Sequence, residues 1–475
     1  MDFSTLNDAL IAVTGEISGF MYTYILVFLL VIVGIWFSVR TKFVQIRYIK
    51  DMFTQLTEKK HVKGERSISS FQALMVSTAS RVGTGNIAGI ATAIATGGPG
   101  AVFWMWLMAV IGAASAFIES TLAQIWKVRG ADGEFRGGPA YYIQQALGKR
   151  WLGIVFAVAL ILCFAFGFNG LQSYNMASAL EYYIPDYATN GAAIALGIVL
   201  AVMTAFVIFG GAKRISIITS VIVPIMALAY IALAIWTTVT NLGEIPAVFS
   251  LIFASAFDFQ SIFGGFAGSV VMLGIKRGLF SNEAGMGSAP NVAATAHVSH
   301  PVKQGLIQTL GVFTDTLVIC TCTAFIILFG GVPDASLSGI RLTQAALVGE
   351  IGPAGSVFVA VAIFLFAFSS IIGNYYYGEA NVRFITRRPW VLTLYRVLVG
   401  AMVLFGALAT LDLAWSLADI TMAFMTLINL VAIVLLGRQA FLLLADYVGQ
   451  RRRGIKNPVY TRDRIPSLED KAECW

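Results

Sequence analysis

A short polar stretch, SRVGTGN at residues 80–86, interrupts an apolar run that is long enough to cross a membrane. Gly83 and Gly85 each weaken a helix by roughly 1 kcal/mol, and Arg81 inside a bilayer costs a few kcal/mol unless it is paired or hydrated. A helix that breaks there frees backbone N–H groups for an anion and carbonyl groups for a cation. These residues therefore predict a binding site at membrane depth for a carboxylate and an accompanying cation.

A second interruption lies five predicted spans later, in GFAGSVVMLGIKRGLFSNEAG at residues 265–285. We expect this helix to break around Val271–Ile275, with Gly274 closest to the ligand because glycine lets a ligand approach the backbone. The carbonyl groups freed at this break would suit an ammonium group, while Met272 and Ile275 would line a pocket for the rest of the molecule. Together the two breaks predict a site for an amino acid zwitterion.

The composition indicates that these breaks lie inside a membrane. Of the 475 residues, 58% are hydrophobic and 12% are charged, whereas soluble domains have about 25% charged residues. Runs of roughly 20 apolar residues predict about eleven helical spans, and hence an all-α polytopic membrane protein. The expected spans cover residues 17–39, 71–97, 100–126, 151–184, 189–210, 214–239, 260–285, 304–331, 353–379, 390–410 and 415–444.

The distribution of basic residues predicts the orientation of these spans. Lys and Arg gather between residues 40 and 66 and again between 127 and 150, whereas the alternate loops at 185–190 and 241–260 have none. By the positive-inside rule, the N-terminus lies outside and the C-terminus is cytoplasmic, in the cell (inner) membrane. The net charge of +7 is then a signal of topology, and we expect no nucleic-acid partner.

The spacing of the two breaks predicts an internal repeat. Two five-helix halves have opposite orientations because five is odd, and paired broken helices are typical of transporters built from inverted repeats. We expect an extra N-terminal helix and cytoplasmic loop over 1–70, a first repeat over 71–240, an inverted second repeat over 241–444 and a cytoplasmic tail over 445–475. The polar part of this tail, from Arg451 to Trp475, is expected to be mobile.

Five motifs resemble one known family, the alanine or glycine:cation symporters of the amino acid-polyamine-organocation superfamily. The resemblance implies a leucine-transporter-like five-plus-five fold with one extra N-terminal helix. It also implies sodium-coupled import of small neutral amino acids by alternating access, with sodium as the coupling ion. The motifs are VGTGNIAGIATAI (82–94), GGPGAVFWMWLMAVIGAASAFIESTLAQ (97–124), FRGGPAYYI (135–143), GLFSNEAGMGSAP (278–290) and FAFSSIIGNYYYGE (366–379).

The predicted substrate contacts come from both breaks and from two further spans. Phe168 is expected to act as a lid one turn before Gln172, which contacts either the substrate or a neighbouring helix. The full set of residues expected to contact the substrate is Ser80, Thr84, Gly85, Asn86, Phe168, Gln172, Met272, Gly274, Ile275 and Asn374.

The resemblance also implies a sodium site. In this family, the adjacent hydroxyl groups of Ser369 and Ser370 would join the carbonyl groups of Ala79 and Val82. As an alternative, both serines bond to carbonyl groups of their own helix. Proton coupling through the buried acids Asp315 or Glu119 is the alternative to sodium.

Asn374 departs from the family pattern, in which this position is often a tryptophan that closes a pocket sized for alanine or glycine. A small amide there leaves glutamine open as a larger substrate. Glu283 is expected to tie its half-helix to a basic neighbour as part of an inner gate, and Arg81 to pair with a buried acid or to reach water.

The sequence lacks the signatures of other classes of protein. The stretch GTGNIAG at 83–89 is close to a dinucleotide fingerprint, but it has no preceding strand and no βαβ unit around it. The chain has no phosphate-binding GxxxxGK[ST] loop and no nucleophile–base constellation, so we predict neither an ATP-driven pump nor an enzyme. A channel would need a continuous polar pore instead of two local breaks.

Overall fold

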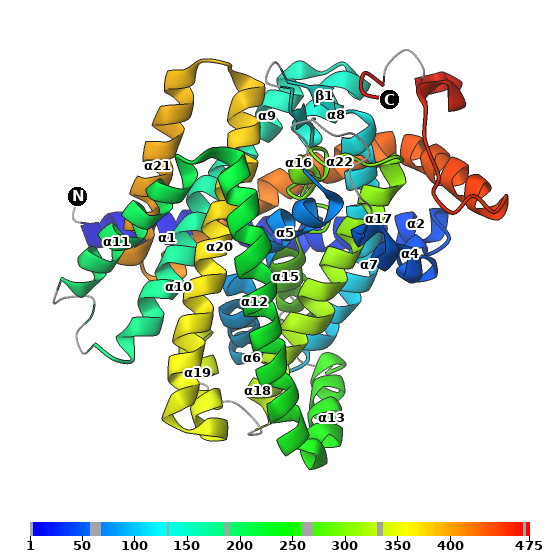
Figure 1. Ribbon diagram of the computed structural model, residues 1–475. Coiled ribbons are helices and arrows are strands. Elements are labelled where there is room, and N and C mark those ends of the chain that lie inside the picture. Colours follow the sequence, from blue (N-terminus) through cyan, green and yellow to red (C-terminus); the bar gives the residue numbers. More distant parts are fainter. Residues whose placement is uncertain are drawn as a thin grey trace.

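The computed structural model describes residues 3–57, 68–130, 133–184, 187, 191–258, 269–329, 336–468 and 472–475 (Figure 1). Helices form nearly all of this part. The sheet within it is a single hairpin of β1 (Val128–Arg129) and β2 (Phe135–Arg136). The predicted all-α class is therefore confirmed.

The chain begins with a helix that is separate from the two groups of helices that follow. This helix consists of α1 (Phe3–Met21) and α2 (Val27–Arg40), which a π-helical turn joins at Tyr22–Leu26. The short helices α3 (Val44–Arg47) and α4 (Ile49–Leu56) follow at an elbow. Contacts with α7 and α22 hold this N-terminal unit against the body of the molecule.

The remaining helices form two groups that follow each other along the chain. The first group is α5 (Ser70–Arg81), α6 (Ile90–Gly97), α7 (Ala101–Ile125), α8 (Pro139–Leu147), α9 (Arg150–Ile161), α10 (Asn169–Glu181), α11 (Ala192–Ile208) and α12 (Gly211–Thr240). The second is α13 (Ile245–Ala256), α15 (Val270–Asn282), α16 (Pro290–Ala293), α17 (Pro301–Val312), α18 (Thr321–Leu328), α19 (Gly339–Ile351), α20 (Pro353–Ile385), α21 (Pro389–Leu408) and α22 (Leu411–Arg452). Short 3₁₀ turns lie at Leu242–Glu244, Arg462–Arg464 and Pro466–Leu468.

Several of these helices have the length and apolarity of membrane spans. Eight such helices occur in the described part, and they bury only part of their apolar surface inside the molecule. On α12, for example, Ile225 is 62% exposed and Leu228 is 66% exposed. Exposed apolar faces of this length are stable only in hydrocarbon, so the chain is a multi-pass membrane protein.

Helices from both groups meet at the centre of the molecule. Figure 1 shows α5 and α15 near its middle, beside α7 and α17, with α12 and α20 close by. Helix α7 packs against α15 and α17, and α20 packs against α5, α9, α10 and α12. The ends of α5 and α15 are therefore enclosed on all sides by other helices.

The expected mobile tail is instead packed against the body of the protein. The Tyr460 N–H donates to the carbonyl of Ser299 (2.8 Å), and Trp475 Nε1 donates to the carbonyl of Gln124 (2.9 Å). Leu468 is 1% exposed. The prediction was wrong because the tail carries aromatic and aliphatic side chains that find buried positions against α7, α17 and α22.

Candidate functional site

The predicted first break is present at Val82–Gly83. A capping box at Ser69 and Gln72 starts α5, which ends at Arg81. After Gly83 the chain continues as a π-helical segment (Gly85–Gly89) and then as α6. The local glycines and the polar residues around them thus end one half-helix and start another, as their helix propensities predict.

Side chains occupy the backbone donors that this break frees. The Gly83 N–H donates to Asn86 Oδ1 (2.9 Å), and the Thr84 N–H donates to Gln172 Oε1 (3.1 Å). The structure therefore brings the predicted residue Gln172, from α10, to the half-helix terminus. Its amide oxygen accepts the Thr84 N–H, in the position that a carboxylate oxygen would occupy.

Both glycines of the break are required by close packing. A Cβ atom on Gly83 would lie 2.3 Å from Ser370 Oγ and 3.0 Å from Gln172 Oε1. A Cβ atom on Gly85 would lie 2.6 Å from the ring of Phe280 on α15. Any larger residue at either position would push apart the helices that meet here.

A cluster of oxygen atoms lies on the other side of the break. Ser370 Oγ, from α20, donates to the carbonyl of Ala79 (2.9 Å) and lies 3.4 Å from the carbonyl oxygen of Val82. All three groups are buried, and oxygen atoms in such an arrangement suit a hard cation. Three of the four predicted sodium ligands thus meet at this point.

The structure does not bring Ser369 to this cluster. Its hydroxyl donates to the carbonyl of Phe366 in its own helix (2.9 Å) and lies 3.7 Å from Met226 Sδ. Adjacent residues on a helix point about 100° apart, and here Ser370 faces the break while Ser369 bonds within its own helix. For Ser369, the alternative of bonding within its own helix is what the structure shows.

The predicted position of the second break is wrong. Helix α15 is continuous from Val270 to Asn282, and among the described residues around it the chain unwinds at its end, where Glu283, Gly285 and Gly287 have positive φ angles of 56°, 86° and 84°. Glycine adopts this conformation without strain, and a Cβ on Gly287 would also lie 2.6 Å from Pro139. The segment SNEAGMGSAP is therefore the counterpart of VGTGN.

The shift in position removes three predicted residues from the neighbourhood of the break. Gly274 packs against α7, where a Cβ would lie 2.5 Å from the carbonyl oxygen of Ala101. Met272 and Ile275 are buried in the hydrophobic core. These three residues precede Glu283 by at least eight positions, or about 12 Å of helix. Phe280, farther along α15, contacts the first break in their place.

Glu119 of α7 holds the unwound segment. Its carboxylate accepts the N–H of Gly285 (3.3 Å), the N–H of Gly287 (3.0 Å) and Asn429 Nδ2 (2.8 Å). Asn429 also donates to the carbonyl of Gly285 (2.8 Å) and accepts a bond from the hydroxyl of Tyr142. A buried carboxylate with three donors replaces the helical hydrogen bonds that the loop has lost.

One hydroxyl connects the two breaks. Ser80 Oγ lies 3.0 Å from Glu283 Oε1 and 2.7 Å from Asn374 Oδ1, and Asn374 Nδ2 donates to Asn169 Oδ1 (3.0 Å). Ser288 Oγ donates to the other oxygen of Glu283 (2.5 Å). Hydroxyl groups therefore hold Glu283, and in the described part no basic residue forms the ion pair that we predicted for it.

A second polar cluster surrounds Asp315, which lies in the π-helical segment Phe313–Cys320. Its carboxylate accepts Asn86 Nδ2 (2.7 Å), Ser281 Oγ (2.5 Å) and Thr316 Oγ1 (3.0 Å). The structure thus connects the predicted residue Asn86 to an acid 229 positions away. Sequence reasoning noted Asp315 as an acid within a span but missed Ser281 as its partner, because nothing in the local sequence gives the pairing.

Arg81 lies among three buried acids without pairing with any of them. It is 2% exposed, its Nη1 makes one long bond to the carbonyl of Gln308 (3.4 Å), and its Nε and Nη2 have no partner in the described part of the chain. Its charge interacts at longer range with Glu119, Glu283 and Asp315. The expected direct pair with an acid is therefore absent from the residues that the structure describes.

A layer of aromatic rings covers the first break on one side. Phe168, the predicted lid, lies 4.5 Å from Phe280 between ring centroids, and Phe280 lies 5.1 Å from Trp415. Above Trp415, Arg277 and Lys276 both pair with Asp419 of α22 (3.0 and 2.6 Å). Sequence reasoning missed Asp419, although an acid near the start of a predicted span was a visible signal.

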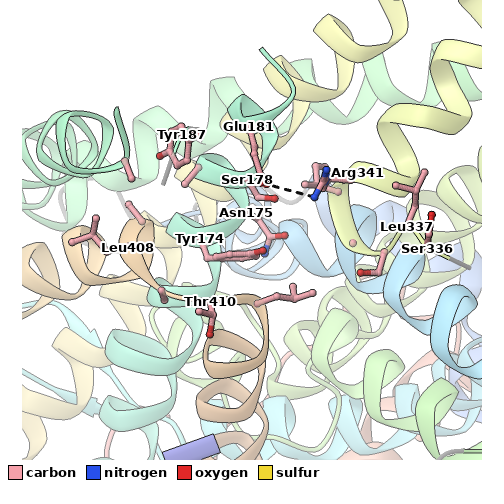
Figure 2. A pocket seen from close by; sticks show the side chains of 18 residues that line it. Tyr174, Asn175, Ser178, Glu181, Tyr187, Ser336, Leu337, Arg341, Leu408 and Thr410 are labelled. Atoms are coloured by element: carbon pink, nitrogen blue, oxygen red, sulfur yellow. Dashed lines mark ion pairs between the residues drawn. The ribbon is translucent and has the colours of Figure 1, made fainter. Parts of the chain in front are cut away.

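A pocket of about 440 Å³ lies among α10, α19 and the connection from α21 to α22 (Figure 2). Asn175 and Tyr187 point into it, and Asn175 follows Gln172 by three residues on α10. Arg341 and Glu181 face each other at 3.9 Å across one end of the pocket. No predicted site residue lines this pocket.

Comparison with known proteins extends these observations to the whole chain. The sequence profile of the sodium:alanine symporter family matches residues 7–462. The amino-acid carrier protein AlsT of Bacillus subtilis (strain 168) is 52% identical over 460 residues, covering 96% of this chain and 96% of AlsT. The probable sodium/glutamine symporter GlnT of the same organism is 48% identical over 464 residues, covering 98% of this chain and 95% of GlnT.

A solved structure supports the fold. The crystal structure of MhsT in complex with L-phenylalanine superposes with a TM-score of 0.54, covering 86% of this chain and 93% of that one, at 15% sequence identity. This likeness confirms the predicted leucine-transporter-like fold, while the number of eleven spans stays a prediction. Because the family profile extends over almost the full length and includes both broken helices, the chain belongs to the sodium:alanine symporter family.

Proposed function

We propose that this protein is a secondary active symporter that couples the inward movement of sodium to the import of small neutral amino acids, with alanine and glycine as the first candidates. The observation that carries the proposal is the pair of groups at the first break. The Ser370 hydroxyl lies within hydrogen-bond distance of the carbonyl oxygens of Ala79 and Val82, which the break releases from the helix. On the opposite side of the break, the Thr84 N–H donates to the amide oxygen of Gln172. One backbone break thus has acceptors for a cation and donors for a carboxylate.

The geometry suggests how substrate binds. A carboxylate that displaces the Gln172 amide from the Thr84 N–H gains a charge-assisted hydrogen bond at the positive end of a half-helix. The aromatic layer of Phe168 and Phe280 would cover the bound molecule. Sodium between Ser370 and the two carbonyl groups would fix the break in its binding conformation, so each ligand would favour the binding of the other.

Sidedness follows from the charge distribution. The pocket of Figure 2 includes the start of α22 and the end of α10, which the positive-inside rule places outside. We propose that this pocket lies on the outer face and that the cluster of Lys276, Arg277 and Asp419 closes the path from that face to the break. The N-terminus is then outside and the C-terminus cytoplasmic.

Glutamine is the second candidate substrate. Two observations favour it: the small amide of Asn374 at the junction of the two breaks, and the name of the relative GlnT, a probable sodium/glutamine symporter. A transporter of either specificity would use the same sodium site, so only uptake measurements distinguish the two.

Uptake into proteoliposomes tests the function. We expect labelled alanine and glycine to accumulate when an inward sodium gradient is present, and not when sodium is equal on both sides. Uptake that needs no cation gradient would contradict symport, and uptake driven by a proton gradient alone would replace sodium with protons. Saturation by glutamine and not by alanine would change the substrate.

Replacing Asn374 with tryptophan is expected to narrow selectivity toward glycine and alanine. Asn374 is fully buried beside Ser80 and Asn169, so a large ring there would fill the space on which a longer substrate depends. Competition of unlabelled glutamine against labelled alanine uptake measures the change, with Asn374→Ala as the control that removes the amide without adding volume. Equal competition in Asn374→Trp and the unsubstituted protein would place Asn374 outside the pocket.

A further inference from the structure

Two adjoining grooves lie between the elbow that follows α2 and the end of α22. Their volumes are about 270 and 800 Å³, and Arg47, Tyr48, Val448 and Arg452 line both of them. Figure 1 shows α2 and α4 on the right of the molecule, on the side toward which α22 runs. Two candidate membrane spans have basic ends here, at Arg40 and Arg452, and the positive-inside rule places these ends on the cytoplasmic side of the membrane.

The walls of these grooves carry a strong positive charge. The acid among the lining residues is Asp51, which pairs with Arg451 at 2.9 Å. In the part of the chain that the structure describes, the other basic groups of the walls have no carboxylate partner within ion-pair distance. The basic residues that line the grooves are Arg40, Lys42, Arg47, Lys50, Arg451 and Arg452.

Aromatic rings support two of these cations without neutralising them. The Arg40 guanidinium lies 5.3 Å from the ring of Phe441, and the Arg47 guanidinium lies 5.4 Å from the ring of Tyr48. Such contacts position a guanidinium group without neutralising its charge. Arg47 Nη1 also donates to the carbonyl of Lys42 (3.3 Å), and its other N–H groups are available to an anion. Bidentate donors of this kind match the oxygen atoms of a phosphate group.

The elbow itself has the form of an interfacial segment. Four large apolar side chains on it are exposed: Phe43 (48%), Ile46 (52%), Ile49 (40%) and Phe53 (57%). They continue the exposed apolar face of α2, where Val39 is 57% exposed. Apolar side chains beside clustered Lys and Arg are typical of helices that lie at the boundary between headgroups and acyl chains.

The backbone of the elbow turns through two residues in the left-handed conformation. Lys42 and Phe43 have φ angles of 55° and 53°, a left-handed conformation that is unfavourable for residues other than glycine. The Phe43 N–H donates to the carbonyl of Ser38 (2.7 Å), which fixes the turn. The turn separates α3 from α2, and Arg47 of α3 lines both grooves together with Arg452.

We propose that these two grooves form a binding site for the headgroup of an anionic phospholipid, with its phosphate held by Arg47 and Arg452 and its acyl chains beside the exposed apolar residues of the elbow. The proposal does not depend on the transported substrate. Juxtamembrane basic residues attract anionic lipids, so several around one cavity favour such a lipid over a zwitterionic one.

Native mass spectrometry of the purified protein tests the site. We expect phosphatidylglycerol to bind at least tenfold more tightly than phosphatidylcholine, and the double variant Arg47→Gln/Arg452→Gln to remove that preference. The matched control is Arg387→Gln/Arg388→Gln, which removes two exposed cations from residues that line neither groove. The charge-preserving variant Arg47→Lys/Arg452→Lys should retain most of the preference and shows whether the fold tolerates substitution.

Three results would overturn the proposal. The first is an equal loss of preference in the two glutamine variants, which would show a general effect of net charge. The second is an unchanged preference in Arg47→Gln/Arg452→Gln. The third is displacement of the bound lipid by millimolar inorganic phosphate together with tight binding of phosphate alone, which would assign the site to a soluble anion.

Discussion

Replacing Ser370 with alanine is expected to raise the sodium concentration for half-maximal uptake at least tenfold. The hydroxyl bridges the carbonyl groups of Ala79 and Val82, and its removal takes one oxygen from the proposed cation site. A bond to a charged group contributes about 1.5–3 kcal/mol, and each 1.4 kcal/mol corresponds to a tenfold change in affinity. Sodium titrations of alanine uptake in proteoliposomes measure the shift.

The neighbouring serine provides the control. Ser369 bonds to Phe366 in its own helix, so Ser369→Ala should change the sodium requirement less than twofold while removing an equal volume. Equal shifts in the two variants would show that the effect comes from packing of α20. An unchanged sodium requirement in Ser370→Ala would remove this residue from the cation site.

The sequence allowed the first break to be predicted well because its signals are local. Gly83 and Gly85 disfavour a helix, and the polar residues beside them have no place in hydrocarbon unless they face protein or a ligand. Gln172 was also identified correctly as a polar group near this site, because an amide inside an apolar span is conspicuous. The fold class followed from composition and from the repeated pattern.

The position of the second break could not be predicted from the local sequence. Glycine at 274 looked like a point of ligand approach, but its small size serves the packing of α15 against α7. The unwinding at Glu283 depends on Glu119 and Asn429, which lie 166 and 144 positions from Gly285. Propensity alone cannot distinguish a glycine that packs from a glycine that unwinds when distant partners decide the outcome.

The partners of Arg81 also could not be predicted from the local sequence. Its sequence position suggested either an ion pair or a water-filled path, whereas the structure surrounds it with a glycine, a carbonyl group and three acids beyond ion-pair distance. A charge shared among several acids leaves each of them free to keep its own hydrogen bonds. Glu119 and Glu283 can therefore hold the backbone and the hydroxyl groups of the two breaks at the same time.

The substitution of Glu119 by glutamine is expected to lower the rate of sodium-driven uptake by a factor on the order of 100. The carboxylate accepts the N–H groups of Gly285 and Gly287, and a glutamine amide can accept through one oxygen only and would place its own N–H₂ group against a donor. The loss of one charge-assisted bond costs about 1.5–3 kcal/mol, and an unpaired donor adds to that cost. The unwound segment would then no longer hold Glu283 against Ser80.

Thermal unfolding of the variant distinguishes a local effect from a global one. We expect the midpoint of unfolding to fall and the uptake of alanine to decrease more steeply than the remaining folded fraction. Glu244→Gln is the matched control, because Glu244 is exposed in the short turn Leu242–Glu244 and lies in neither break. If Glu119→Gln reduced uptake only in proportion to the folded fraction, then Glu119 would stabilise the protein without positioning the break. Full uptake with an unchanged unfolding midpoint would show that the segment keeps its conformation without this carboxylate, and that Asn429 alone is sufficient to hold it.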